Sequence, residues 1–205
     1  DRVWLFDEEG RRYRAEVASV REREAESVLS ILEVLPPWEV QTRIILAPAL
    51  LKAGTMDDVI LKATELGVSR IAPVESERSV VRSGERTEKK VERWARIART
   101  AAKQSRAAYS PIIDPPVRLE KFISSCRSER RFFLNEHGGA SLKRLRTEGG
   151  EPPSEAAVLV GPEGSWSGNE EKAIAAAGFE PVRLGRTILR AETAVLTLFV
   201  HEWNW

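Results

Sequence analysis

The first 35 residues alternate apolar and polar positions in the way that short β-strands do. Two such runs, 2–6 and 12–20, flank a turn-forming DEEG segment, and a third run covers 27–35. The Pro-Pro-Trp sequence at 36–38 then breaks the pattern and indicates a linker. Three strands bury little apolar surface, and the chain opens in what reads as the middle of a strand. We therefore expect a small β module whose first strands are missing.

From residue 42 onward, apolar runs alternate with amphipathic segments. The expected strands are 42–50, 68–74, 112–113, 131–136, 156–161 and 181–184. The expected helices are the segment between Thr55 and Gly67, residues 86–106 and 119–126, the segment between Ser167 and Gly178, and residues 191–203. This alternation predicts an α/β domain with a mainly parallel sheet covered by helices on both faces. Residues 146–155 read as a surface loop.

Two of these helices carry clear boundary signals. Thr55 is the expected N-cap of the first, with Asp58 three residues later, and Gly67 closes it. Ser167 and Glu170 have the spacing of a capping box, in which each residue binds the backbone of the other.

Two glycine-containing loops follow predicted strands. GPEG at 161–164 fits neither the phosphate-binding nor the dinucleotide-binding glycine pattern, and GSWSG at 164–168 lacks the central serine of a nucleophile elbow. LGRTILRAETA at 184–194 has the same strand-loop-helix placement. Ligands of open α/β sheets bind beyond the carboxyl ends of the strands. Either loop alone is as consistent with a tight turn as with a ligand site.

The second loop carries charged residues where the last helix begins. Arg190 follows the apolar pair Ile188-Leu189, so we expect it to be partly desolvated and suited to a phosphate or a carboxylate. Glu192 is consistent either with catalysis or with a stabilising charge at a helix N-terminus.

The predicted helix at 86–106 has a basic side and an apolar side. The basic side contains Arg86, Lys89, Arg93, Arg96, Arg99, Lys103 and Arg106. The apolar side, which we expect to dock on the sheet, contains Val91, Trp94, Ile97, Ala98, Ala101 and Ala102. Arg78 and Arg82 precede this helix. A solvated charged face is the simpler interpretation, but the excess of arginine favours contact with nucleic acid.

Composition narrows the classes of chemistry. The chain has 32 Lys and Arg against 31 Asp and Glu, so net charge alone nominates no partner. A single cysteine, Cys126, excludes an internal disulfide and is expected to be a small buried apolar residue. With only two histidines, His137 and His201, the sequence does not favour a histidine metal site. His137 follows a strand and is consistent either with a place at the same sheet edge or with a structural role. His201, beside Trp203 and Trp205, is expected on a packing or oligomer surface. No membrane span or signal peptide is visible, and we expect a cytoplasmic protein.

Several segments in order resemble one family. They are LLKAGTMDDVILKATELGVSRIAPVESERSVV, KQS, VLVGPEGSW and LGRTILRAETA. Together they resemble the bacterial ribosomal small subunit methyltransferase E family, whose members methylate N3 of a uridine in 16S ribosomal RNA with S-adenosylmethionine. The resemblance spans approximately residues 40–200.

The resemblance implies a SPOUT-type fold with a deep trefoil knot near the C-terminus, and a homodimer. It assigns 39–205 to the methyltransferase domain. Residues 1–38 resemble part of a PUA-like β-barrel whose N-terminal strands are absent from this sequence. The implied partner is small-subunit ribosomal RNA or the assembled subunit.

Carried over to this sequence, the resemblance assigns the following residues. Cofactor binding falls to Leu134, Asn135, Glu136, Gly161, Pro162, Glu163, Gly164, Leu184, Gly185, Ile188, Leu189, Arg190 and Thr193. RNA-facing polar positions are Lys52, Lys62, Glu65, Arg78 and Gln104, to which the basic helix adds Arg93, Arg96, Lys103 and Arg106.

Two positions depart from the family pattern. Ser165-Trp166 replaces Gly-Phe, a mild change unless the backbone needs a positive φ. Ala107 replaces an arginine, and Arg106 next to it would point about 100° away if the helix continued.

The expected reaction needs alignment of the methyl donor and loss of the uracil N3 proton. Arg190 is the candidate for stabilising charge on the uracil oxygens, and Glu192 or Glu163 the candidate proton acceptor. Two other hypotheses are a related methyltransferase for a different RNA position, including one in tRNA, and a non-catalytic RNA-binding protein of ribosome assembly.

Overall fold

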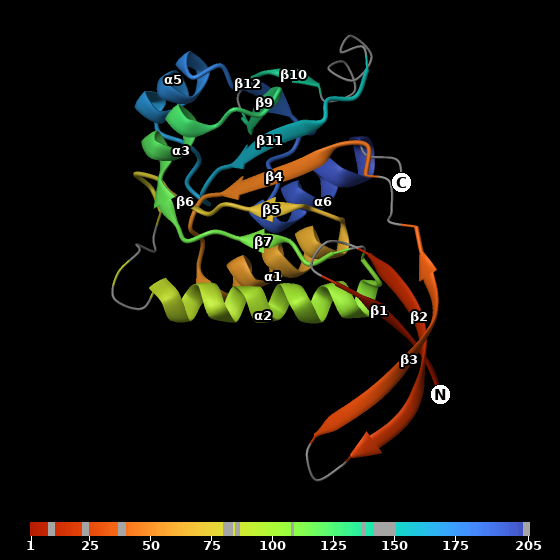
Figure 1. Cartoon of the computed structure of the whole chain (residues 1–205). Helices are drawn as coiled ribbons and strands as arrows, with labels where there is room; N and C mark the ends of the chain where they lie inside the picture. The colour runs from red at the N-terminus through yellow and green to blue at the C-terminus, as the bar shows by residue number, and fades with distance from the viewer. Residues whose placement is uncertain are drawn as a thin grey trace.

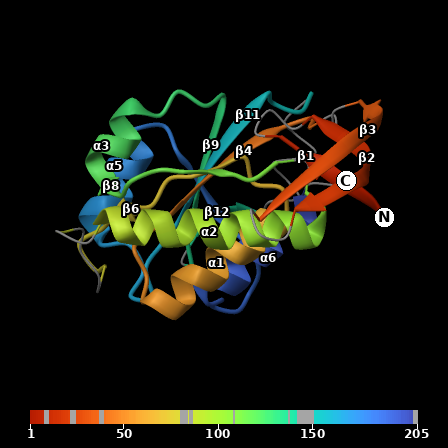
Figure 2. The same ribbon diagram turned by 60° about the horizontal axis from the view of Figure 1, so that its bottom comes forward.

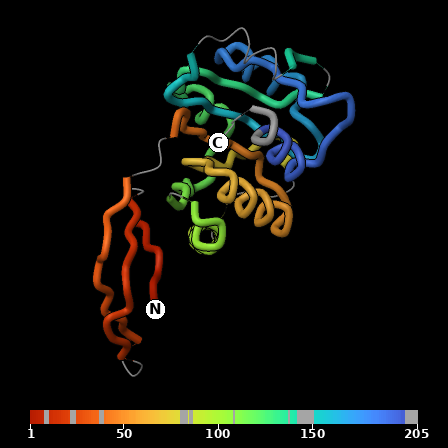
Figure 3. Tube along the Cα trace, turned by 90° about the vertical axis from the view of Figure 1, so that its right-hand side faces the viewer, coloured from red at the N-terminus to blue at the C-terminus, as the bar shows by residue number. Residues whose placement is uncertain are grey.

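The projecting sheet and the α/β body are separate in space. The computed structural model describes residues 1–7, 11–21, 25–36, 40–79, 84, 87–107, 109–136, 138–141 and 151–202. A three-stranded sheet formed by the first residues extends away from a layered α/β body (Figures 1 and 3). Most of the predicted turn at 7–10 lies outside the described residues, as does most of the predicted linker.

The projecting sheet contains β1 (Arg2–Phe6), β2 (Arg12–Arg21) and β3 (Glu26–Leu35), in antiparallel order β1-β2-β3. This confirms the three predicted strands. Among its described apolar side chains, only Ala15 is fully buried, whereas Trp4 is 58% exposed. Three strands present two broad faces and form no closed core by themselves.

The body is built on a parallel sheet. Its strands are β4 (Arg43–Pro48), β5 (Arg70–Ile71), β7 (Ile112–Ile113), β9 (Arg130–Leu134), β10 (Ala140–Ser141), β11 (Glu155–Val160) and β12 (Glu180–Arg183). Their order is β10-β12-β9-β11-β4-β5-β7, and the neighbouring pairs run parallel. The predicted α/β class with a mainly parallel sheet is therefore confirmed.

The predicted strand 68–74 is divided into β5 and β6 (Val74–Glu75), and β6 pairs with β8 (Val117–Arg118) in a separate small sheet. Pro73 lies between β5 and β6, and a proline has no N–H to donate to a ladder. Sequence reasoning missed β8 and β10, which have two residues each and show no periodicity.

Helices cover both faces of the parallel sheet (Figure 2). One face meets α1 (Ala53–Glu65) and α6 (Ala191–Glu202), and α2 (Thr87–Ser105) packs outside α1. The other face meets α3 (Leu119–Ser125) and α5 (Gly168–Ala176). The apolar side of α2 packs against α1 and against the edge strand β7, so the predicted docking on the sheet is confirmed at that edge.

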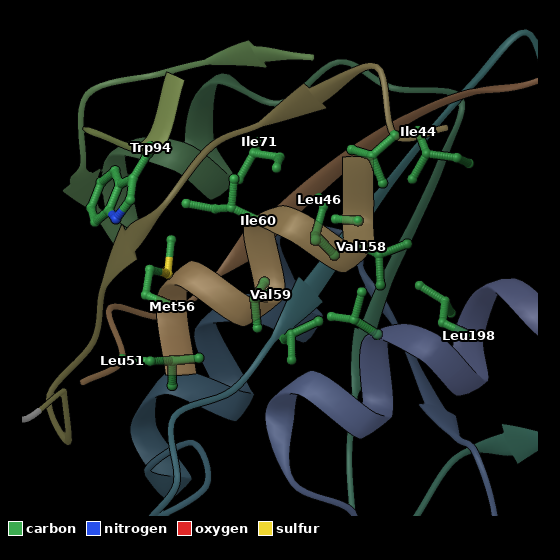
Figure 4. Close-up of a cluster of buried hydrophobic side chains, with 14 of the residues drawn as sticks. Ile44, Leu46, Leu51, Met56, Val59, Ile60, Ile71, Trp94, Val158 and Leu198 are labelled. Atoms are coloured by element: carbon green, nitrogen blue, oxygen red, sulfur yellow. The ribbon is translucent and has the colours of Figure 1, made fainter. Parts of the chain in front are cut away.

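Alternate residues of the central strands supply two separate cores. Ile44 and Leu46 of β4 join the core beneath α1 and α6, together with Val158 and Leu198 (Figure 4). Ala47, the next residue of β4, faces the core beneath α3 and α5. This alternation is the period of two that a strand buried on both faces requires.

Helix boundaries confirm two predictions and correct one. Gly67 ends α1 with φ +77°, and Val68 N–H donates to the carbonyl of Ala63 at 3.0 Å. Ser167 and Glu170 form the capping box of α5. The N-cap prediction for Thr55 was wrong, because α1 begins at Ala53 and its N-cap is Lys52, which makes no side-chain cap. Backbone geometry before Ala53 starts the helix without a capping side chain.

None of the helices in the described part of the chain combines the length and apolarity needed to cross a membrane.

Ile71→Ala on β5 is expected to lower the free energy of unfolding by about 2–5 kcal/mol, because the removed atoms leave a cavity in a closed core. Ile71 is 0% exposed, and Ile112 on the neighbouring strand β7 is 64% exposed. Ile112→Ala is the matched control and should cost less than about 1 kcal/mol. Equilibrium urea unfolding measures both, and equal losses would contradict this account of the core.

Candidate functional site

Three chain segments that follow neighbouring strands meet at one edge of the parallel sheet. Strands β11, β9 and β12 are adjacent and parallel, so their carboxyl ends lie together. The residues that follow them surround a cavity of about 500 Å³. Its lining comes from 134–136 at the end of β9, 160–163 and 165–166 at the end of β11, and 182–192 and 194 at the end of β12, with Thr55 of α1 and Glu171 of α5.

This pocket brings together most of the residues that the sequence nominated as a ligand site. Lining it are Leu134, Asn135, Glu136, Gly161, Pro162, Glu163, Leu184, Gly185, Ile188, Leu189, Arg190 and Glu192. Gly164 and Thr193 are not in its lining. Thr193 is exposed, and its carbonyl accepts a hydrogen bond from Thr197 Oγ1 at 2.9 Å within α6.

Other lining residues were not predicted. They include Thr55, Ser165, Trp166, Glu171, Arg183, Arg186 and Thr187. The only signal for Ser165 and Trp166 was their departure from the family pattern, and Thr55 carried only a helix-capping signal. Their place in the pocket results from contacts between distant segments.

The loop after β11 has a strained residue at its centre. Ser165 N–H donates to the carbonyl of Pro162 at 2.9 Å, which closes a tight turn. Ser165 itself has φ +58°, a left-handed conformation that favours glycine. The replacement of glycine by serine is therefore not neutral for the backbone. The Ser165 hydroxyl donates to Glu136 Oε1 at 2.9 Å.

Trp166 forms part of the pocket wall. Its side chain is 4% exposed, and a Cβ at Gly161 would lie 3.1 Å from Trp166 Nε1. Among the residues that the structure describes, Nε1 finds no hydrogen-bond partner. A side chain at position 161 would therefore require the indole ring to shift by a few tenths of an ångström.

The loop after β12 forms an open rim. Ile188 is 72% exposed, and Arg190 is exposed as well. The predicted partial desolvation of Arg190 was wrong, because both residues lie where the pocket opens to solvent. The carbonyl of Arg190 accepts the N–H of Ala194 at 2.8 Å and so begins α6. Glu192, half-buried in the first turn of this helix, lies beside it on the pocket.

Charges of both signs surround the pocket. Acidic side chains are Glu136, Glu163, Glu171 and Glu192, and basic ones are Arg183, Arg186 and Arg190. Within the described residues, no group of three or more His, Cys, Asp or Glu side chains could hold a metal ion. A mixed lining of this kind suits a ligand that carries both positive and negative groups.

Two residues nominated for RNA contact touch the loop after β11. Lys52 Nζ lies 3.7 Å from Glu163 Oε2, and both side chains are largely exposed. Arg78 Nη1 donates to the carbonyl of Gly164 at 2.7 Å. The structure thus places both residues beside the pocket.

The remaining candidates for RNA contact, apart from Arg106, lie on α1 and α2. Arg96, Lys103 and Gln104 are exposed on α2, Lys62 is half-buried on α1, and Glu65 is exposed on α1. Arg93 is exposed too, and its guanidinium pairs with Asp57 of α1. Arg82 and Arg86 lie outside the described residues.

Arg106 was predicted to lie on the basic side of the helix, but it lies beyond the end of the helix. The helix α2 ends at Ser105, Arg106 has φ +56°, and Ala107 N–H donates to the carbonyl of Ala102 at 3.0 Å. This is a left-handed helix ending, so the 100° rotation expected between residues 106 and 107 does not apply.

Among the weaker candidates, the structure describes only the side chain of Cys126, which does not line the pocket. Cys126 is buried, as predicted, and its thiol lies 3.7 Å from Ser128 Oγ. His137, Trp203 and Trp205 lie outside the described residues, and so does the side chain of His201.

Comparison with known proteins identifies the fold and the family. A protein called ribosomal RNA small subunit methyltransferase E from Aquifex aeolicus is 35% identical over 193 residues, which cover 93% of this chain and 80% of that protein. The protein of the same name from Synechocystis is 32% identical over 163 residues, and the match covers 76% of this chain but 51% of that protein.

A crystal structure of a ribosomal RNA small subunit methyltransferase E from Neisseria gonorrhoeae, bound to S-adenosylmethionine, superimposes with a TM-score of 0.88 and 30% identity. It covers 98% of this chain and 81% of that one. Residues 38–200 match the family model of the RNA methyltransferase domain. The chain therefore belongs to the RNA methyltransferase domain family.

Proposed function

We propose that this protein methylates N3 of a uridine in small-subunit ribosomal RNA, with S-adenosylmethionine as the methyl donor. The observation that carries this proposal is the convergence of 134–136, 160–166 and 182–194 on one pocket, in a chain of the RNA methyltransferase family. Relatives named for small-subunit ribosomal RNA support the substrate, and the Neisseria structure bound to S-adenosylmethionine supports the donor.

The pocket fits such a donor. Its volume of about 500 Å³ lies within the range of small-molecule sites. A Cβ at Gly185 would meet nothing within 4 Å, so this part of the backbone can be approached closely by a ligand. Trp166 Nε1, which has no hydrogen-bond partner in the described part of the chain, is a buried donor that an acceptor at this wall would stabilise. Carboxylates and arginines in the lining match the ammonium, sulfonium and carboxylate groups of S-adenosylmethionine.

When bound, S-adenosylmethionine supplies a methyl group on a positively charged sulfur. The protein's own task is to align uracil N3 and to help it lose its proton. Arg190 stands at the open rim, where an RNA base can reach it, and its guanidinium would stabilise negative charge on the uracil oxygens. Glu192 and Glu163 are the candidate proton acceptors. Glu192 is the more enclosed of the two, whereas Glu163 pairs with Lys52.

RNA binding is assigned to the basic residues around the pocket and on α2. Lys52 and Arg78 border the pocket loop, and Arg93 pairs with Asp57 on α1, which begins near the pocket-lining Thr55. Arg96, Lys103 and Gln104 extend this surface along α2 with exposed side chains. The target base would leave its stack to reach the pocket, with the surrounding phosphates held by this surface.

We also infer the finer architecture that the family resemblance implies. Residues 1–38 would form part of a PUA-like domain and 39–205 a SPOUT domain that is knotted and dimeric in the cytoplasm. The insertion of β12 between β10 and β9 supports a threaded C-terminal path, as does the contact of α6 with α1 and β11.

The central test is methyl transfer from labelled S-adenosylmethionine to small subunits that lack the modification, followed by mapping of the methylated base. Methylation at uridine N3 is the expected result.

Arg190→Ala should reduce turnover by about a hundredfold, because preorganised charge stabilisation is lost. Arg190→Lys, which keeps the charge without the forked donor geometry, should retain intermediate activity.

Near-normal turnover by Arg190→Ala, with RNA still bound, would refute the role of this arginine. Calorimetry that finds no S-adenosylmethionine binding to the unaltered protein would favour a non-catalytic RNA-binding role. Methylation at another position or in tRNA would redirect the substrate assignment.

Gly161→Ala is expected to weaken S-adenosylmethionine binding by about tenfold, because the added methyl group would lie 3.1 Å from Trp166 Nε1 and displace the pocket wall. Gly54→Ala on α1 is the matched control, since its methyl group would meet nothing within 4 Å. Calorimetric titration compares the two variants. Unchanged affinity in Gly161→Ala would show that this wall does not touch the donor.

RNA affinity should fall with salt, and Arg96→Ala and Lys103→Ala should each lower the slope of log affinity against log salt by about one. Arg127→Ala, which removes an exposed arginine next to α3, is the control and should leave the slope unchanged. Filter binding over a salt series gives the slopes. If both α2 variants keep the original slope, the basic side of α2 is only a solvated surface.

A further inference from the structure

The left-handed residue Ser165 is held from two sides by segments that are distant in sequence. On one side, Arg78 Nη1 donates to the carbonyl of Gly164 at 2.7 Å and reaches the carbonyl of Trp166 at 3.5 Å. These two carbonyls flank Ser165 in the chain. One guanidinium therefore engages the backbone immediately before and after the strained residue.

The turn that carries Arg78 is itself fixed. Glu170, 4% exposed, accepts the N–H of Glu77 through Oε1 at 2.7 Å and the N–H of Ser167 through Oε2 at 2.8 Å. The hydroxyl groups of Ser76 and Ser79 are buried and lie 2.8 Å apart. Arg78 thus projects from a turn that is docked on the N-terminus of α5, so its guanidinium reaches Gly164 from a fixed base.

On the other side, the Ser165 hydroxyl donates to Glu136 Oε1 at 2.9 Å. Glu136 follows β9, and the preceding Asn135 N–H donates to the carbonyl of Val182 at 2.9 Å. Both Ser165 and Glu136 line the pocket. This contact joins the segment after β9 to the loop after β11 across one part of the pocket wall.

We propose that Arg78 and Glu136 are positioning residues for the donor pocket, which hold Ser165 in its left-handed conformation and thereby fix the wall from Gly161 to Trp166. The proposal rests on S-adenosylmethionine being the ligand of this pocket. It gives Arg78 a role toward the donor, whereas the sequence placed it on the RNA surface. A residue with a Cβ disfavours φ +58°, so external contacts are needed to keep it there.

The principal variants are Arg78→Ala and Glu136→Ala. Each is expected to weaken S-adenosylmethionine binding by about five- to tenfold in calorimetric titration, because the loop loses one of its anchors. Glu136→Gln keeps an acceptor for the Ser165 hydroxyl and should lose less than about twofold. Arg78→Lys keeps one charged donor and should fall between the native protein and Arg78→Ala.

Two matched controls remove similar contacts elsewhere. Arg127 donates to the carbonyl groups of Ser124 and Cys126 at 2.8 and 3.1 Å, away from the pocket. Glu129 accepts the hydroxyl of Ser154. Arg127→Ala and Glu129→Ala should leave the dissociation constant unchanged. Thermal unfolding of all variants separates loss of affinity from loss of folded protein, and the conservative substitutions carry the test if an alanine variant does not fold.

Ser165→Gly tests the part played by strain. Glycine tolerates the left-handed conformation without help, so Arg78→Ala should cost less affinity in the Ser165→Gly protein than in the native one. Equal losses in the two backgrounds would overturn the proposal that Arg78 acts through Ser165.

Hydrogen exchange without ligand separates this proposal from the proposed function. Arg78→Ala should speed exchange of the Ser165 and Ser167 amides, and Arg127→Ala should not. If the native protein binds no S-adenosylmethionine, the proposed function fails. The exchange rates of the Ser165 and Ser167 amides still show whether Arg78 holds the loop. Unchanged exchange and unchanged donor affinity in Arg78→Ala, together with weaker RNA binding, would make Arg78 an RNA contact only and overturn the proposal.

Discussion

Burial of the central strands on both faces is the constraint from which the rest of this molecule follows. Strands β4 and β11 pair in parallel, and their alternate side chains fill two separate cores. Parallel neighbours require crossover helices, which must lie on the faces, and they bring their carboxyl ends to one edge. The loops after β9, β11 and β12 therefore have no other place to meet. The direction of the strands therefore determines where the pocket forms, and the side chains determine what it binds.

Within this frame, the pocket depends on several loop features, of which the left-handed conformation of Ser165 is costly by itself. A serine in a left-handed conformation, a glycine against an indole ring and an arginine at an open rim all lie on loops. Rigid strands below and side-chain contacts from the sides keep these features in place. Such arrangements are typical of binding sites, where the geometry needed for a ligand differs from the geometry that the chain prefers.

Local patterns predicted the parts of this fold that depend on local physics. The strand periods, the capping box at Ser167 and Glu170, and the helix stop at Gly67 rest on neighbouring residues, and the structure has them. The failures arise where distant contacts or backbone geometry decide. Thr55 carries a capping side chain that the helix does not use, and Arg106 leaves the helix in a left-handed turn. Arg190 follows the exposed Ile188 and the half-buried Leu189, and its own exposure depends on where the pocket opens to solvent, which no local rule predicts.

The two anchors of Ser165 limit how far this loop can be treated as a portable motif. Arg78 acts on a carbonyl 86 residues ahead of it, and Glu136 meets a hydroxyl 29 residues away. A family member that received residues 161–166 alone would have the sequence of the loop without the contacts from Arg78 and Glu136 that hold it. Transplantation would have to bring the docked turn at 76–79 and the end of β9 as well. The three separated segments that build this pocket wall must therefore change together in evolution. A serine at position 165 is tolerated only where the turn at 76–79 and the end of β9 are compatible with it.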